Sequence, residues 1–154
     1  MRGQKIIDIA CAELGQTESP KSSNKTKYGK WFGLDGVAWC GIFCSWAYAQ
    51  AGVSLGNIGF KKGFAGCQTA VHHFKASGEV TINPQTGDIV FFDWNEDGRY
   101  NHVGIFKAWK IKNKEFFTIE GNTSLTNQSN GGEVMLRIRS VKNVIFVHPK
   151  VLDK

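Results

Sequence analysis

The chain has 154 residues, 42% hydrophobic and 12% aromatic, and its 19 Lys and Arg against 13 Asp and Glu give a formal charge of +6. This length suits one domain with a buried core, and the composition excludes a disordered chain. No apolar run approaches the ~20 residues that span a bilayer, so no membrane span is expected. The charge indicates either simple solubility or an anionic partner, and the absence of a nucleic-acid motif argues against nucleic acid.

The first half of the chain carries helical patterns. An opening helix is predicted to stop at Gly15, and Asp8 and Glu13 within it argue against a signal peptide. Two further helices are predicted over residues 40–51 and 67–76. The apolar face of the opening helix comprises Ile6, Ile7, Ala10, Cys11 and Leu14.

The second half is rich in β-branched and aromatic residues, which favour strands. Short loops with Gly, Asn and Asp separate the segments, which favours antiparallel hairpins and a meander. Helices followed by strands predict an α+β fold, with the helices on one face of an antiparallel sheet of about five or six strands. The predicted strands are residues 88–94, 102–109, 115–121, 134–139 and 144–149.

Cys40 stands at the predicted start of a helix, after the aromatic, glycine-rich stretch YGKWFGLDGVAWC. The partial positive charge of a helix N-terminus favours a thiolate and lowers the cysteine pKa below its free value of ~8.5. The free N–H groups there can also stabilise an oxyanion. Cys40 is therefore a candidate nucleophile, and a buried structural cysteine is the alternative.

Of the four histidines, His102 is the best candidate for a general base, because it opens a predicted strand directly after a long polar turn. A third group should hold its imidazole in one tautomer. If the strands over 102–109 and 115–121 form a hairpin, Glu120 and Asn122 return close to His102. Both residue types can accept the ring N–H, and the sequence leaves the choice open.

The other cysteines have structural interpretations. No export signal is evident, so free thiols are expected rather than disulfides. Cys11 and Cys67 are expected to be buried fillers. Cys44 lies one turn after Cys40 and is expected to be buried and inert, with a redox partner or a metal ligand as the alternative.

Two further groups are candidates for binding. Asp93, Asn95 and Asp97, followed by Gly98, resemble the opening of a calcium loop, but Gly104 stands where the bidentate Glu is expected. A plain Asx-rich turn is the alternative, and no cofactor is expected to be required. The aromatic residues near the nucleophile, Trp31, Phe32 and Trp39, are candidates for walls of a substrate groove, with core packing as the alternative, and Gln16 is a candidate oxyanion donor.

Four ordered blocks, WCGIFCSWAYAQAG, GDIVFFDW, NHVGIF and IEGNTS, together resemble the CHAP family over roughly residues 3 to 150. These are cysteine- and histidine-dependent amidohydrolases and peptidases of bacterial and phage cell walls, related to the NlpC-type papain-like superfamily. The upstream TESPKSSNKTKYGKWFG is similar to phage endolysin members. The resemblance implies a papain-like fold, Cys40 as nucleophile and His102 as base and then acid. It places the third catalytic position on Glu120, with Asn122 supporting or replacing it.

The resemblance also implies a substrate, peptidoglycan, cut at the glycan–peptide amide or within its peptides. Residues 1–154 are expected to form one catalytic domain without a separate wall-binding domain, most simply a monomer. The absence of a signal peptide suggests a lysin held in the host bacterial cytoplasm until its release onto the cell wall. The alternatives are an antibacterial effector toxin with the same chemistry, a non-catalytic wall-binding module and a metal-dependent hydrolase.

Overall fold

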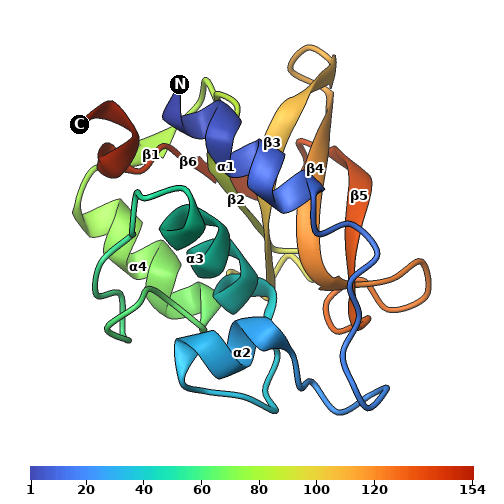
Figure 1. The fold of residues 1–154 in the computed structure, drawn as a ribbon. Helices are drawn as coiled ribbons and strands as arrows, with labels where there is room; N and C mark the ends of the chain where they lie inside the picture. Colours follow the sequence, from blue (N-terminus) through green and yellow to red (C-terminus); the bar gives the residue numbers. More distant parts are fainter.

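The computed structural model describes all 154 residues and has helices on one side of a six-stranded sheet, an α+β fold (Figure 1). The helices are α1 (Arg2–Cys11), α2 (Lys27–Phe32), α3 (Cys40–Gln50) and α4 (Cys67–Ala76), and a short 3₁₀ helix, η1 (Lys150–Asp153), closes the chain. The strands are β1 (Val80–Thr81), β2 (Ile89–Phe92), β3 (His102–Ile111), β4 (Glu115–Thr123), β5 (Glu133–Ser140) and β6 (Val144–Val147). None of the helices has the length and apolarity that a membrane crossing needs.

The three helices predicted from the sequence are confirmed as α1, α3 and α4, although α1 ends at Cys11 rather than near Gly15. Helix α2 lies in a stretch where the sequence predicts no helix. It has only 6 residues, too few for an apolar period to show, and its ends are fixed locally. The side chain of Thr26 accepts the N–H of Gly29, and Gly33 ends the helix in the left-handed conformation, with φ of 90°.

All strand pairs are antiparallel, and the order across the sheet is β1-β6-β2-β3-β4-β5. The five predicted strands are confirmed, but the meander is wrong at its last step, because β6 returns to pair with β2 and not with β5. All four residues of β2 are buried, so this strand lies inside the sheet and needs a neighbour on each side.

Helix α3 lies in the centre of the core and contacts α1, α2, β3 and β4. Its residues are apolar on every side, and most of them are buried, as expected of a helix enclosed by other elements. The hydroxyl of Tyr48 near its C-terminal end donates to the carbonyl of Gly87. The first turn of α3 is therefore held against β3 and β4, and its last turn against the loop before β2.

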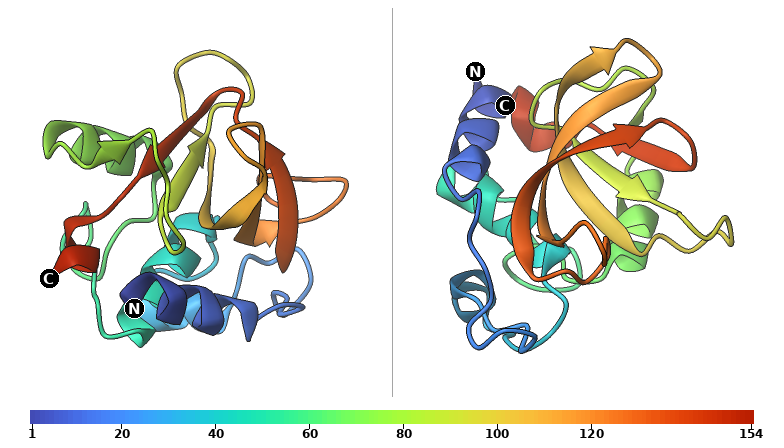
Figure 2. Two further views of the ribbon diagram at one scale, coloured as in Figure 1. Left: turned by 90° about the horizontal axis from the view of Figure 1, so that it is seen from above. Right: turned by 90° about the vertical axis from the view of Figure 1, so that its right-hand side faces the viewer.

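The sheet is strongly curled (Figure 2), and this curvature buries a second apolar cluster apart from the helices. The cluster comprises Val90, Phe92, Phe106, Phe116 and Phe146. The helical layer therefore needs to cover only one face of the sheet.

The two chain ends lie close together at the upper left of Figure 1. The guanidinium of Arg2 in α1 donates to the carbonyl of Val151 in η1. His148 holds η1 further, since its ring nitrogens bond Asp88 and Asp153.

We expect Gly121→Ala to destabilise the fold, because β4 lies directly against the start of α3. A Cβ at this position would lie 2.7 Å from the Cβ of Phe43 and 3.0 Å from the ring of Trp39. The free energy of unfolding, measured with urea, should fall by about 1–3 kcal/mol. Gly66→Ala is the control, because a Cβ there would meet its nearest neighbour at 3.7 Å. Equal losses in the two variants would contradict this account.

Candidate active site

Cys40 is the first residue of α3 and is 4% exposed. The preceding residue, Trp39, makes no side-chain cap to the helix, so the helix N-terminus at the thiol keeps its uncapped partial positive charge. Trp39 is itself fully buried, and its indole N–H donates to Glu18 at 3.1 Å. Cys40 therefore begins a helix whose preceding residue, Trp39, is anchored to the loop between α1 and α2.

His102, the first residue of β3, has a fully buried imidazole. Its ring stacks on Trp94, with centroids 5.3 Å apart, and on Phe92, with centroids 5.9 Å apart. These aromatic contacts fix the plane of the imidazole.

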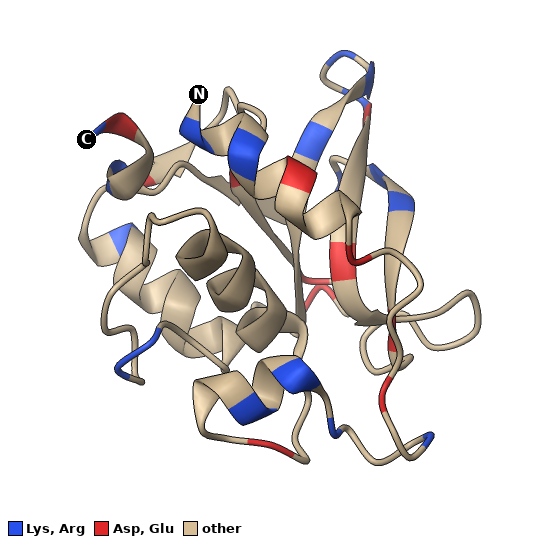
Figure 3. Cartoon of the chain, viewed as in Figure 1, with Lys and Arg blue, Asp and Glu red and all other residues tan.

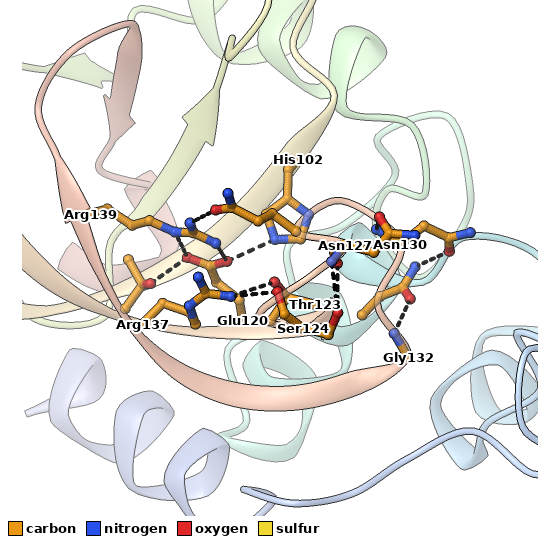
Figure 4. Close-up of polar contacts among 12 residues, drawn as sticks. His102, Glu120, Thr123, Ser124, Asn127, Asn130, Gly132, Arg137 and Arg139 are labelled. Carbon is orange, nitrogen blue, oxygen red and sulfur yellow. Dashed lines mark hydrogen bonds and ion pairs between the residues drawn. The ribbon is translucent and has the colours of Figure 1, made fainter.

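Glu120 on β4 accepts the Nε2–H of His102 through Oε1 at 2.9 Å (Figure 4). Its other oxygen, Oε2, accepts the hydroxyl of Thr118. Gly104 on β3 makes the space for this side chain, because a Cβ there would lie 2.6 Å from the Cγ of Glu120. The second ring nitrogen of His102, Nδ1, is buried with no oxygen or nitrogen partner. Cys40 lies close enough to raise the pKa of the imidazole, and Nδ1 is the nitrogen left to face it, because Nε2 bonds Glu120.

Asn122, the other candidate for the third position, does not contact the imidazole. Its φ of 59° coincides with a register shift in β4 between Glu120 and Thr123, which turns the side chain away. The amide oxygen accepts the N–H of Gly132 at 3.0 Å, and the amide nitrogen donates to Asn130 at 2.9 Å. Asn122 therefore ties the loop after β4 to the start of β5.

Cys67, expected from the sequence to be a buried filler, is buried but also adjoins Cys40. A hydrogen bond from the Cys67 thiol is the main cause that holds the pKa of Cys40 well below its ordinary value. Burial opposes this, and the hydrogen bond and charge of His102 add to the lowering. No sequence pattern showed this role, because Cys67 lies 27 positions after Cys40 and meets it only through the fold.

The pKa values of His102 and Glu120 move in opposite directions. Burial opposes a charge on His102, but the hydrogen bonds to Cys40 and Glu120 outweigh it and raise its pKa to about 9. Burial likewise opposes a charge on Glu120, but its bonds to Arg139 and His102 outweigh that and lower its pKa to about 2. The arrangement favours a thiolate, an imidazolium and a carboxylate in one row.

The comparison with protein families adds a second line of evidence. The family model of the CHAP domain matches residues 32–122, more than half of the chain, and this range contains Cys40, His102 and Glu120. The chain belongs to the CHAP family. A search of curated proteins found no match. CHAP domains are generally cysteine- and histidine-dependent amidases or peptidases, so membership supports a hydrolase that acts on peptidoglycan.

Cys44 of this CHAP domain is fully buried one turn after Cys40. Burial raises its pKa well above the ordinary value, and the charges of Cys40 and Glu120 raise it further. A thiol in this environment stays protonated and is a poor nucleophile. All four cysteines are free thiols, as the sequence predicts.

The candidate substrate-binding residues are not gathered at Cys40. Trp39 is fully buried and Phe32 is 7% exposed, so both pack in the core and offer little surface to a substrate. Trp31 is half-buried, and Lys62 lies over its ring at 5.0 Å. Gln16 is exposed, and its carbonyl accepts the N–H of Val134 at the edge of β5.

The carboxylates of the loop over residues 93–98 accept hydrogen bonds from the loop's own backbone. Both oxygens of Asp93 already accept backbone N–H groups, from Asp97 at 3.2 Å and from Gly98 at 2.9 Å. A carboxylate oxygen of Asp97 accepts the N–H of Arg99 at 2.9 Å, and Asn95 is exposed. Nowhere in the chain are three or more His, Cys, Asp or Glu side chains placed to hold a metal ion. The acidic residues form an Asx-type turn.

We expect the pair of His102 and Glu120 to contribute most to stability between about pH 4.5 and 6.5. The contribution of Glu120 to the free energy of unfolding is present above its ordinary pKa of 4.5 and is lost as the pH falls toward about 2. The contribution of His102 to the free energy of unfolding is present below its ordinary pKa of 6.5 and is lost as the pH rises through about 9. Urea unfolding of the wild type and His102→Gln from pH 2 to 10 should show a difference of about 3 kcal/mol that is widest in this window. A difference independent of pH would contradict the ion pair.

We expect the calcium chelator EGTA to leave the thermal unfolding midpoint unchanged, because the carboxylates of the turn are occupied by backbone donors. Added calcium should also have no effect on this midpoint. A rise with calcium that Asp93→Asn or Asp97→Asn removes would show that the turn rearranges around the ion.

Proposed function

We propose that this chain is an endolysin-like peptidoglycan hydrolase in which Cys40 is the nucleophile, His102 the general base and then acid, and Glu120 the group that orients the imidazole. The observation that carries the proposal is the buried row of Cys40, His102 and Glu120, with one ring nitrogen toward the sulfur and the other bonded to the carboxylate at 2.9 Å. This arrangement supports Glu120 rather than Asn122 as the third member.

In the first half of the reaction, the thiolate of Cys40 attacks the carbonyl carbon of an amide. The tetrahedral oxyanion lies at the start of α3, where backbone N–H groups can donate to it. The C–N bond then breaks, and Nδ1 of His102 gives its proton to the leaving nitrogen. The products of this half are a free amine and a thioester on Cys40.

In the second half, neutral His102 takes a proton from water, and the resulting hydroxide attacks the thioester carbon. The C–S bond breaks, a carboxylic acid is released, and the thiolate and imidazolium are restored. Throughout the cycle, Glu120 accepts the Nε2–H, so Nδ1 is the nitrogen that transfers the proton.

A polar cavity of about 480 Å³, which Cys40, His102 and Glu120 do not line, supports a polar substrate. The cavity lies between the loop that joins α1 to α2 and the loop after β4, and no hydrophobic side chain lines it. Glu18 connects the cavity to the site, because its carboxylate accepts the indole N–H of Trp39. Amides, hydroxyls and carboxylates of this kind suit the sugar hydroxyls and peptide groups of peptidoglycan. The lining includes Thr17, Glu18, Asn24, Asn127, Asn130 and Glu133.

The surface charge supports an anionic cell wall as the place of action. Lys and Arg lie on several elements rather than in one patch (Figure 3), and the formal charge is +6. Spread positive charge increases the rate of encounter with a polyanionic surface without specifying a sequence or a base.

We expect the wild type to release fragments from purified Gram-positive peptidoglycan and Cys40→Ala to release none. Mass spectrometry of the products identifies the bond: a new amino end on alanine would show cleavage of the glycan–peptide amide, and an end within the stem peptide or crossbridge would show an endopeptidase. Cys40→Ser should lose at least about a thousandfold in rate. Cys44→Ser is the matched control, since it changes the same atoms one turn away, and it should keep substantial activity.

Three other results would change the proposal. Loss of activity in Cys44→Ser but not in Cys40→Ser would show that the nucleophile is misassigned. Binding to the wall without release of fragments would support a non-catalytic wall-binding module. Cleavage that is blocked by a cognate immunity protein would support an effector toxin with the same chemistry.

A further inference from the structure

Arg139 on β5 lies outside the range that the family model matches, but its guanidinium contacts the proposed catalytic carboxylate directly. Its Nε donates to Oε2 of Glu120 at 2.8 Å, and Nη2 donates to Oε1 at 2.6 Å (Figure 4). The two parallel bonds form a bidentate pair, which fixes the plane of the carboxylate as well as its position.

The surroundings of Arg139 also connect it to His102. The guanidinium is 7% exposed and lies 4.7 Å from the ring centroid of Trp94 and 5.4 Å from that of Phe92. These are the two rings on which the imidazole of His102 stacks. The same two aromatic rings therefore contact both the guanidinium and the imidazole that bond Glu120. The guanidinium of Arg139 cannot rotate without disturbing these rings.

Arg137, two residues earlier on β5, shows that this contact is specific. Its guanidinium donates to the hydroxyl of Thr123 at 3.3 Å and to the carbonyl of Ser124 at 2.8 Å, and makes no hydrogen bond to Glu120. Arg137 supports the loop after β4. Of the two arginines, only Arg139 donates to the carboxylate that His102 also bonds.

We propose that Arg139 is a positioning residue for the hydrolase: by clamping both oxygens of Glu120, it aims Oε1 at Nε2 of His102 and so keeps Nδ1 toward Cys40. This inference rests on the proposed function for the roles of these three residues. It adds a fourth member to the row, and charges of alternating sign then run from Arg139 through Glu120 and His102 to Cys40.

The effect on Cys40 has a definite sign. Without the guanidinium, Glu120 protonates more readily, and a neutral carboxyl stabilises the imidazolium of His102 less. Loss of the positive charge itself also disfavours the thiolate. Both effects make Cys40 harder to ionise.

Other groups face the same site and remain in the variants. Cys67 from α4 and Cys44 from α3 lie beside Cys40, and the charge of Arg137 acts on Glu120 from β5. None of them offers Glu120 a second pair of donors, so we expect no substitute for the clamp.

The test is the rate at which iodoacetamide alkylates Cys40 between pH 4 and 10, with the modified cysteine identified by mass spectrometry. In Arg139→Met, the pH at which the rate reaches half its maximum should rise by about one unit or more. Arg139→Lys, which keeps the charge but not the fork, should give a smaller rise. Arg137→Met, the matched control on the same strand, removes a charge that acts on Glu120 but no hydrogen bond to it, so the rise should be clearly smaller than in Arg139→Met.

Peptidoglycan turnover gives a second readout. Arg139→Met should lower kcat by about 10- to 100-fold with little change in KM, as expected when a support of a catalytic histidine is removed. If Arg139→Met does not fold, Arg139→Lys alone must show a rise in the pH of half-maximal alkylation and a partial loss of kcat. An unchanged alkylation profile in a folded Arg139 variant would overturn the inference.

The alkylation assay also separates this inference from the proposed function. If the pH profile of alkylation depends on Arg139 but the protein does not hydrolyse the wall, the role of Arg139 stands and the proposed substrate is rejected. If the protein hydrolyses the wall but the profile does not depend on Arg139, the proposed function stands and the role of Arg139 is rejected. A Cys40 that reacts no faster than a free thiol at pH 6 in the wild type would overturn both the ion pair and the clamp.

Discussion

The carboxylate of Glu120 is fully buried, and it stays charged only because His102, Arg139 and Thr118 all donate to it. An isolated charge in such a place would cost several kcal/mol, so these partners must come together when the chain folds. They lie on β3, β4 and β5, and the thiol that the imidazole faces lies on α3. The register of three strands and the seating of one helix are thus set by the same few contacts that the proposed chemistry requires.

Two glycines make this seating possible. At Gly104 the missing side chain leaves room for Glu120, and at Gly121 it lets β4 lie against Phe43 and Trp39. Larger residues would hold the helix and the strands apart, and the sulfur of Cys40 would then not reach the imidazole. The close packing of backbone against side chain is therefore a requirement of the site and not only of the core.

Much of this could be predicted from the sequence. Periodicity and composition gave the three longer helices and five strands, and helix position and turn chemistry singled out Cys40 and His102. The choice between Glu120 and Asn122 depended on a single left-handed residue in β4, which no pattern marks. The pairing of β6 with β2, the contact of Cys67 with Cys40 and the clamp of Arg139 depend on partners distant in the chain, and local sequence carries no information on them.

The adjacency of the two chain ends, held by Arg2 and Val151, has a consequence for engineering. Helix α3 has 11 residues and rises about 1.5 Å for each, so about 15 Å separate the thiol at its start from its last turn, which lies on the side of the chain ends. Either terminus can then carry a fused module, and a linker can join the two in a circular permutant, without entering the row of buried charges. The attachment points for such fusions lie on the side of the domain opposite the thiol of Cys40.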